Sequence, residues 1–400
     1  MNLPVSRGET VGHWPDQWQR VLLEAAARRD QRAIDAWEAW AARFGTASND
    51  KSVTAIFPAV YVNLSALNYS GPGMRELRSA YQQTWMTNQL RNRGLTDLLQ
   101  SLQAASVDSI PLKGISLALF YYGDLGARRM GDVDLLVRPS ELGQVSRVLA
   151  ANGWNSEDEI PPAHLMPFIH AMGWRHPKWG ALDLHWMPFT VDCSAAATAA
   201  FWKRAKRKDL NEASMLVPST TDMLVHMCFH SRKPDRQAIC RWVLDLLMLL
   251  DSRDDEVEWA ELVDRARHYG MVAPVRDALA YVRREFEANV PDAIIEQLAE
   301  IETTDRDRRR YQQLSRPSRR GSVGRMISTH WWRYSAGCAC EKRKRNPVGF
   351  VRYVLAYGRL RYRCRSVPQI LKGLLSSRPG SERHPASTSE TKEVSAKTPG

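Results

Sequence analysis

Two carboxylates stand two residues apart at the start of an apolar run, Asp132 and Asp134 in the stretch RRMGDVDLLVRP. Alternate residues of a strand point to the same face, so a strand here would set these carboxylates side by side. Neighbouring anions repel unless a cation neutralises them, and oxygen ligands at this spacing suit Mg²⁺, or Mn²⁺, together with substrate phosphates. The pair therefore predicts a divalent-metal site. The structural alternative is that the two aspartates cap the strand or pair with neighbouring arginines.

A third carboxylate, Asp183, lies in the stretch ALDLHW, where polar and apolar residues alternate as in a half-buried strand. If its strand neighbours the first, Asp183 completes a site for two metal ions that bridge an in-line displacement. The alternative is a structural aspartate bonded to His185 or Arg175. His185 lies two residues further and should share the face of Asp183, either supporting a ligand or lying at the rim.

The stretch PLKGIS, residues 111–116, has the composition of a phosphate-binding turn. Gly114 allows a close approach of the backbone to a ligand, and the N-terminus of a following helix offers free N–H groups. Ser116 can donate a hydroxyl, and Lys113 can place a point charge near a triphosphate. Arg129 is a further candidate, since arginine can bind phosphate oxygens through two hydrogen bonds.

Hydrophobic periodicity and turn residues indicate which elements position these groups. The pattern is mixed up to about residue 218 and wholly helical after it, which predicts an α+β fold. In that fold a small mixed β-sheet with flanking helices is followed by an all-helical domain. On the longest predicted helix, apolar residues including Trp85 and Leu90 favour one face. The expected elements are a helical pattern over 14–44, a helix over 74–105, a strand over 109–114, helices over 115–123 and 139–154, a strand over 132–137, and a hairpin over 172–189 with its turn near 178–180.

The ordered segments LKGISLALFYYGDLGARRMGDVDLLV, LAANGW and LDLHW resemble a family of uncharacterised bacterial nucleotidyltransferases. That family belongs to the superfamily with the DNA polymerase beta-like fold, and the resemblance covers about residues 108–190. It implies that Asp132 and Asp134 bind the catalytic metals and that Asp183 is the third carboxylate. Gly114 and Ser116 would hold the triphosphate. This sequence departs from the superfamily in having Lys-Gly-Ile-Ser in place of a Gly-Ser or Gly-Gly pair, and a longer gap from Gly114 to Asp132.

The resemblance implies an enzyme, a nucleotidyltransferase. It would transfer a nucleoside monophosphate, AMP from ATP by default, to a hydroxyl of a small-molecule, peptide or protein acceptor, using Mg²⁺. Two alternatives stay open: an RNA-directed enzyme of the same fold, or a non-catalytic module that binds nucleotide or a partner. The predicted segments are 1–73, N-terminal helices; 74–218, the nucleotidyltransferase-like core; 219–310, a helical bundle; 311–375, a basic helical segment; and 376–400, a disordered tail.

The chain of 400 residues carries a net charge of +12, with much of the excess in residues 306–320, 341–345 and 351–365. Such a basic surface attracts phosphate-bearing partners, either nucleic acid or an anionic membrane surface, unless it is simply a solvated tail. No apolar run is long enough to span a bilayer, and the N-terminus lacks the pattern of a signal peptide. We therefore expect a soluble, cytoplasmic protein.

Two further motifs have residue types that can bind metals. His226 and His230 have helical spacing for zinc, but no HExxH motif accompanies them, so we interpret them as buried or interdomain histidines. Cys338 and Cys340 have the wrong spacing for a zinc ribbon, and six cysteines are too sparse for a disulfide scaffold. We expect reduced thiols.

Overall fold

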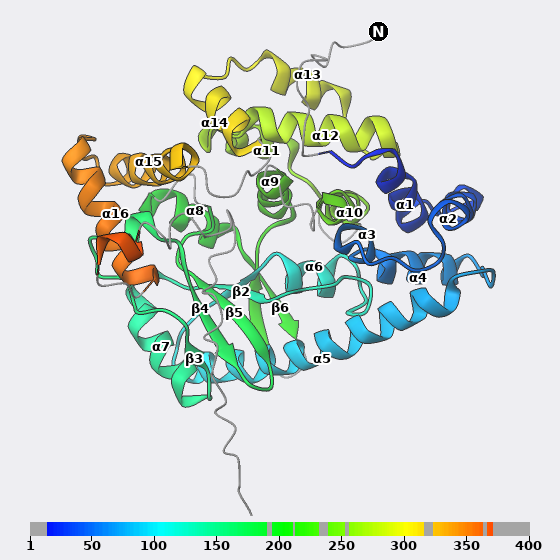
Figure 1. Ribbon diagram of the computed structural model, residues 1–400, viewed down its shortest axis with the longest axis horizontal. Helices are drawn as coiled ribbons and strands as arrows, with labels where there is room; N and C mark the ends of the chain where they lie inside the picture. The colour runs from blue at the N-terminus through cyan, green and yellow to red at the C-terminus, as the bar shows by residue number, and fades with distance from the viewer. Residues whose placement is uncertain are drawn as a thin grey trace, which may run out of the picture.

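The computed structural model describes residues 14–189, 194–210, 213–231, 239–252, 256–315, 323–362 and 366–370. The predicted disordered tail and the side chain of His230 lie outside the described residues. The fold is α+β, as predicted. A five-stranded mixed sheet lies between two helices on one face, α5 (Met74–Ala104) and α7 (Leu142–Ala151), and a large helical part on the other (Figure 1).

The sheet has the strand order β1-β2-β5-β4-β3. The central pair, β2 and β5, is parallel, and the other pairs are antiparallel. The strand predicted over 132–137 and the predicted hairpin are confirmed, with the hairpin turn between residues 176 and 180. The strands are β1 (Ile110–Leu112), β2 (Val133–Leu136), β3 (Asn155–Ser156), β4 (Ala171–His176) and β5 (Gly180–His185).

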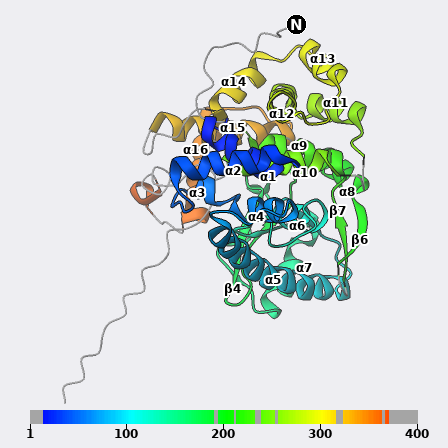
Figure 2. The same ribbon diagram turned by 90° about the vertical axis from the view of Figure 1, so that its right-hand side faces the viewer.

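The two faces of the sheet belong to different hydrophobic cores. Leu135 and Leu184 pack in one core with Leu95 and Leu99 of helix α5 (Met74–Ala104) and with α7 (Leu142–Ala151). Leu136 packs in the other core, with the helices that follow residue 218. Figure 2 shows α5 and α7 on one side of the molecule and the helical part on the other. Because side chains alternate along a strand, the polar residues that alternate with Leu135 and Leu184 face the helical part.

The N-terminal helices join the core of the helical part. The single pattern predicted over 14–44 is two helices, α1 (Gln17–Ala27) and α2 (Gln31–Phe44), because Asp30 accepts a hydrogen bond from the Arg32 N–H and caps the second helix. Together with α3 (Lys51–Thr54) and α4 (Phe57–Ala66), they bury apolar residues in one cluster with the later helices. The later helices are α9 (Thr220–Ser231), α10 (Ile239–Leu250), α11 (Trp259–His268), α12 (Val272–Phe286) and α13 (Asp292–Glu300).

Helix α5 confirms the longest helical prediction, but its predicted single apolar face is wrong. Trp85 and Leu90 are 43% and 48% exposed, because the buried face of α5 changes along its length. Its first half packs on α4, whereas its second half packs under the sheet. Gly94 lies within the helix, where a Cβ atom would collide with the Trp179 ring.

Three elements between residues 194 and 217 have no counterpart in the sequence predictions. They are α8 (Ala195–Arg204) and the antiparallel hairpin of β6 (Lys206–Leu210) and β7 (Ala213–Val217). Strand β6 has the sequence KRKDL, whose charges hide the strand pattern, and it is exposed along most of its length. Between β1 and β2 the chain forms helix α6 (Gly114–Phe120).

The basic C-terminal segment is helical and packs against the core. It comprises α14 (Asp305–Ser315), α15 (Val323–Cys340) and α16 (Pro347–Tyr362). Tyr334 of α15 and Tyr353 of α16 are buried, and their rings lie 5.8 and 5.0 Å from that of Phe168. Cys340 is disulfide-bonded, so the expectation of reduced thiols is wrong for this residue, whereas Cys338 is a free thiol. Among the described helices, none has the length and apolarity needed to cross a bilayer.

We expect His330 to make the packing of α15 on α16 sensitive to acid. Its ring is buried beside Tyr353 and Tyr357, and this burial, with the nearby Arg333 guanidinium, lowers the pKa of His330 to about 3. The unfolded chain therefore takes up a proton at pH values where the folded chain does not, and stability falls as the pH falls from about 6.5 towards 3. At pH 5 we expect a loss of about 2 kcal/mol relative to pH 8 from this residue. Amide hydrogen exchange of α15 and α16 at both pH values, in wild type and His330→Phe, measures it; equal acid sensitivity in the two proteins would refute the role of His330.

Candidate metal and nucleotide site

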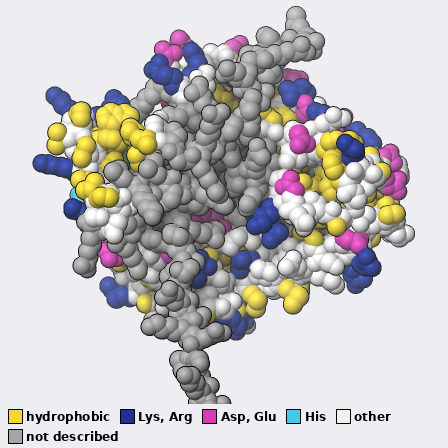
Figure 3. All heavy atoms as spheres, viewed as in Figure 1, with side chains coloured by type: hydrophobic (Ala, Val, Ile, Leu, Met, Phe, Trp, Pro, Cys, Tyr) yellow, Lys and Arg dark blue, Asp and Glu magenta, His cyan; other side chains and the backbone are white. Residues whose placement is uncertain are grey.

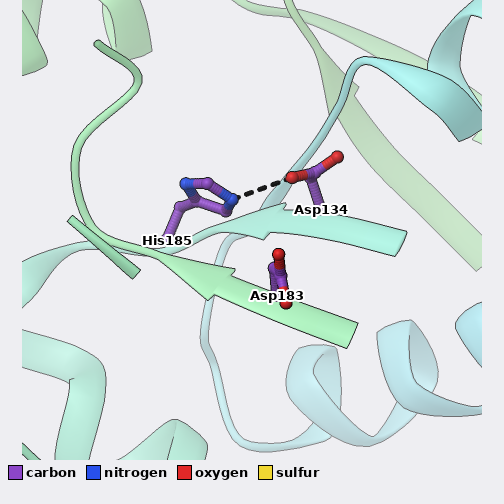
Figure 4. Close-up of side chains that lie close together, drawn as sticks. All are labelled: Asp134, Asp183 and His185. Carbon is purple, nitrogen blue, oxygen red and sulfur yellow. Dashed lines mark hydrogen bonds and ion pairs between the residues drawn. The ribbon is translucent and has the colours of Figure 1, made fainter. Parts of the chain in front are cut away.

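Asp134, Asp183 and His185 converge on one face of the central parallel strand pair. Asp134 of β2 lies directly opposite Asp183 of β5 in the ladder, and His185 follows two residues later on the same face. Figure 4 shows the three side chains together, with a dashed line between His185 and Asp134. Nε2 of His185 lies 2.9 Å from Oδ1 of Asp134. One ligand atom from each residue lies within 4.8 Å of the other two, which is the spacing of a metal-binding cluster.

Lys113 neutralises the buried carboxylate at the centre of this cluster. Its Nζ donates to Oδ1 of Asp134 at 2.7 Å. Burial alone would raise the pKa of the Asp134 carboxyl, but the Lys113 ammonium and the His185 hydrogen bond hold that pKa well below its ordinary value. Burial also lowers the pKa of Lys113, and the carboxylates of Asp134, Asp132 and Asp183 more than offset this effect, so the pKa is raised. The site therefore contains a carboxylate anion and an ammonium cation in contact.

The backbone of Lys113 is strained. Its φ of +48° and ψ of −114° lie in a region that residues with a Cβ atom rarely adopt. The residue forms the turn between β1 and α6. In this conformation its ammonium contacts Asp134 of the neighbouring strand β2. Strain of this kind costs about 1–3 kcal/mol and clusters at functional sites.

Asp132 lies at the edge of the cluster. It precedes β2 and is partly exposed, and it is not one of the three residues whose ligand atoms share the 4.8 Å spacing. It is close enough to contribute to the raised pKa of Lys113. The metal-binding role of Asp132 stays a prediction.

The three remaining candidates from the sequence have different environments. Gly114 begins α6, and a Cβ atom there would lie 3.0 Å from Nη1 of Arg128, so the glycine permits tight packing of the following loop. Ser116 is fully buried and its hydroxyl donates to the Pro111 carbonyl at 2.5 Å. A phosphate would have to displace that bond. Arg129 is exposed.

Two histidines of this region extend what the sequence predicted. His185 was predicted only as a support or rim residue, yet it is buried and supplies one of the three clustered ligand atoms. Its spacing of two from Asp183 was the signal that could have found it. His170, which no sequence motif indicated, precedes β4, and its ring centre lies 5.5 Å from that of His185. His226, by contrast, is buried against the Phe189 ring in the helical core.

A buried ion pair ties the site to the helical part. Arg128 donates two hydrogen bonds to Asp245 of α10, at 2.7 and 2.8 Å, and Tyr122 donates to the same carboxylate at 2.8 Å. Both charged side chains are more than 90% buried. The Asp245 carboxylate raises the pKa of Arg128 although burial opposes this. Arg128 is thus engaged in a structural contact with Asp245 rather than with Asp132 or Asp134.

The donor set of the cluster fits a divalent cation. Carboxylate oxygens suit Mg²⁺ and Mn²⁺, and an imidazole nitrogen favours Mn²⁺ over Mg²⁺. Asp134 Oδ1 already accepts from Lys113 and His185, so a cation would compete with the Lys113 ammonium for this carboxylate. Asp134, Asp183 and His185 are the residues that would hold it.

Comparisons with known proteins identify the family of the chain. The family described as "Uncharacterised nucleotidyltransferase" matches residues 52–287, which is more than half of the chain. The chain belongs to this family. A search of curated proteins finds no match. The crystal structure of an antigenic nucleotidyltransferase-like protein from Paracoccidioides brasiliensis aligns with 55% of this chain and 96% of its own, at 13% identity and a TM-score of 0.34, a similarity too low to support an argument.

Lys113→Met tests whether the ammonium and a metal ion compete for Asp134. The variant keeps the apolar stem but leaves a buried carboxylate without its cation partner, which costs about 3–5 kcal/mol. We expect Mn²⁺ to recover part of this loss, because the metal takes over the neutralisation and binds only the folded state. Thermal unfolding with a chelator and with Mn²⁺ measures the effect, and Lys344→Met at an exposed site is the control. A variant whose melting temperature responds to Mn²⁺ no more than wild type does would argue against a metal on Asp134.

Proposed function

We propose that the chain is a divalent-metal-dependent nucleotidyltransferase that transfers AMP from ATP to a hydroxyl of a small-molecule, peptide or protein acceptor. One observation carries the proposal: the clustering of Asp134, Asp183 and His185 beside the Lys113 ammonium, in a chain of the nucleotidyltransferase family. We propose that the reaction takes place in the cytoplasm, where ATP is abundant. Mg²⁺ or Mn²⁺ is the proposed cofactor.

The chemistry would be in-line displacement at the α-phosphorus. The acceptor oxygen forms a bond to this phosphorus, the bond to the α–β bridging oxygen breaks, and pyrophosphate leaves with the electron pair. A bound divalent cation would supply positive charge to the phosphoryl oxygens. Asp183, partly exposed beside the buried Asp134, is positioned to accept the proton of the hydroxyl. The Lys113 ammonium, which lies beside Asp134, would be able to contact a phosphate oxygen if a cation bound this carboxylate.

The supporting residues would fix the reacting groups. His185 donates to the Asp134 carboxylate and so holds it in one orientation. The role of Asp132 as a further metal ligand, and the roles of Gly114, Ser116 and Arg129 towards the triphosphate, belong to this proposal. Fixed geometry and charge are the main contribution a protein makes to phosphoryl transfer.

Calorimetric binding of the four nucleoside triphosphates, with Mg²⁺ and separately with Mn²⁺, tests the proposal. Wild type is compared with Asp134→Asn/Asp183→Asn and with Asp209→Asn, an exposed control. We expect metal-dependent binding of ATP that only the double variant loses. α-Labelled ATP then identifies the acceptor by label transfer from cell extract fractions. Binding without any transfer to protein, small molecule or RNA would favour the non-catalytic alternative, and label on RNA would favour the RNA-directed one.

A further inference from the structure

Exposed apolar side chains form a patch on α15 and α16. On α15 they recur every four residues, at exposures of 52%, 47% and 38%, and on α16 two of them reach 63% and 55%. The rings of Trp331 and Phe350 lie 5.1 Å apart and join the two helices at this edge. In Figure 3 hydrophobic side chains gather at the upper left, where Figure 1 places α15 and α16. The α15–α16 patch consists of Val323, Ile327, Trp331, Val348 and Val351.

Cations surround the α15–α16 patch. The turn between the helices contains four exposed basic residues in succession, and α16 adds two more on its exposed side. Residues 341–359 contain these six cations and one carboxylate, Glu341, so this segment has a strong positive charge. Figure 3 shows Lys and Arg side chains at the margin of the apolar group. The cations are Lys342, Arg343, Lys344, Arg345, Arg352 and Arg359.

This combination fits a lipid surface better than a nucleic acid. Binding to single-stranded nucleic acid relies on exposed aromatic faces on which bases stack. Here Tyr334, Tyr353 and Tyr357 are buried against one another, and the exposed side chains are mainly aliphatic. Aliphatic groups gain free energy at the boundary between lipid headgroups and acyl chains, and cations around them gain from anionic headgroups.

We propose that α15 and α16 dock the protein onto the surface of an anionic lipid bilayer. The α15–α16 patch would enter the boundary between headgroups and acyl chains, and the basic turn over 342–345 would contact lipid phosphates. The helices would lie on the bilayer rather than cross it, consistent with their lack of a long apolar span. This inference is independent of the proposed nucleotide chemistry, because it uses no residue of the metal and nucleotide site.

Vesicle co-sedimentation of the full chain, without nucleotide or metal, tests the docking. The vesicles are phosphatidylcholine alone, or equal parts of phosphatidylcholine and phosphatidylglycerol. We expect binding to the anionic vesicles only, weakening as salt is added. Lys342→Gln and Lys344→Gln should each reduce the partition coefficient about fivefold. Val348→Ser/Val351→Ser should reduce it by at least about tenfold, through lost apolar burial.

The matched control alters exposed apolar residues elsewhere. Met86→Ser/Leu90→Ser changes side chains of α5 that are 63% and 48% exposed, and should leave vesicle binding unchanged. Circular dichroism confirms that each variant is folded. The proposal is overturned if wild type ignores both vesicle types, or if the control and the α15–α16 variants behave alike. It is also overturned if the patch variants abolish binding to an RNA oligonucleotide or self-association by light scattering, with vesicle binding intact.

Discussion

Replacing Asp134 with asparagine is expected to abolish nucleotidyl transfer, with a fall in rate of about 10³-fold or more. Asp134 is the residue on which the site converges: Lys113 and His185 both contact its Oδ1, and Asp183 lies opposite in the ladder. Asparagine keeps the shape but removes the negative charge that holds a cation. The measurement is the transfer of label from α-labelled ATP under saturating metal, together with metal affinity by calorimetry.

The comparison with Asp132→Asn makes this experiment specific. Asp132 is partly exposed and lies outside the three-residue cluster, so its loss should reduce the rate less than the loss of Asp134 does. Near-ultraviolet circular dichroism of both variants separates lost chemistry from lost folding. Transfer at more than a tenth of the wild-type rate by folded Asp134→Asn would contradict the assignment of this carboxylate.

Breaking the buried Arg128–Asp245 ion pair is expected to destabilise the protein by about 3–5 kcal/mol. Arg128→Met or Asp245→Leu leaves one charge buried without its partner, while both partners are more than 90% buried in the native fold. The double variant Arg128→Met/Asp245→Leu should be much closer to wild type, because neither charge remains to be desolvated. Urea unfolding of the four proteins provides the cycle and its coupling free energy.

An exposed pair provides the control for this cycle. The side chains of Arg93 and Asp97 on α5 are 65% and 37% exposed, and Nε of Arg93 lies 3.0 Å from Oδ1 of Asp97. Arg93→Met should change the free energy of unfolding by less than about 1 kcal/mol, since solvent screens such pairs. If the effects of Arg128→Met and Asp245→Leu simply add in the double variant, the ion pair makes no coupled contribution to stability and the prediction is wrong.

The larger part of the fold could be predicted from local patterns. Alternating residues and the turn near 178–180 identify the hairpin, and the long amphipathic pattern identifies α5. The strand β6, which has a charged sequence, was not predicted, because its strand conformation depends on pairing with β7 rather than on apolar alternation. The exposure of Trp85 and Leu90 was not predicted either, because it depends on which elements pack against α5 along its length.

By itself the sequence predicted that Asp134 and Asp183 lie in two strands, because this conclusion needs only the two-residue period of a strand. Asp132, which was predicted to share the face of Asp134, precedes β2 and lies at the edge of the cluster. Only the tertiary structure decided which of these groups meet. The parallel register places Asp134 beside Asp183, although 49 positions separate them, and the same register includes His185. Lys113, in the turn that follows the third strand β1, places its ammonium on Asp134 and neutralises it. Strand order and register are set by long-range packing, so no local pattern reveals such contacts.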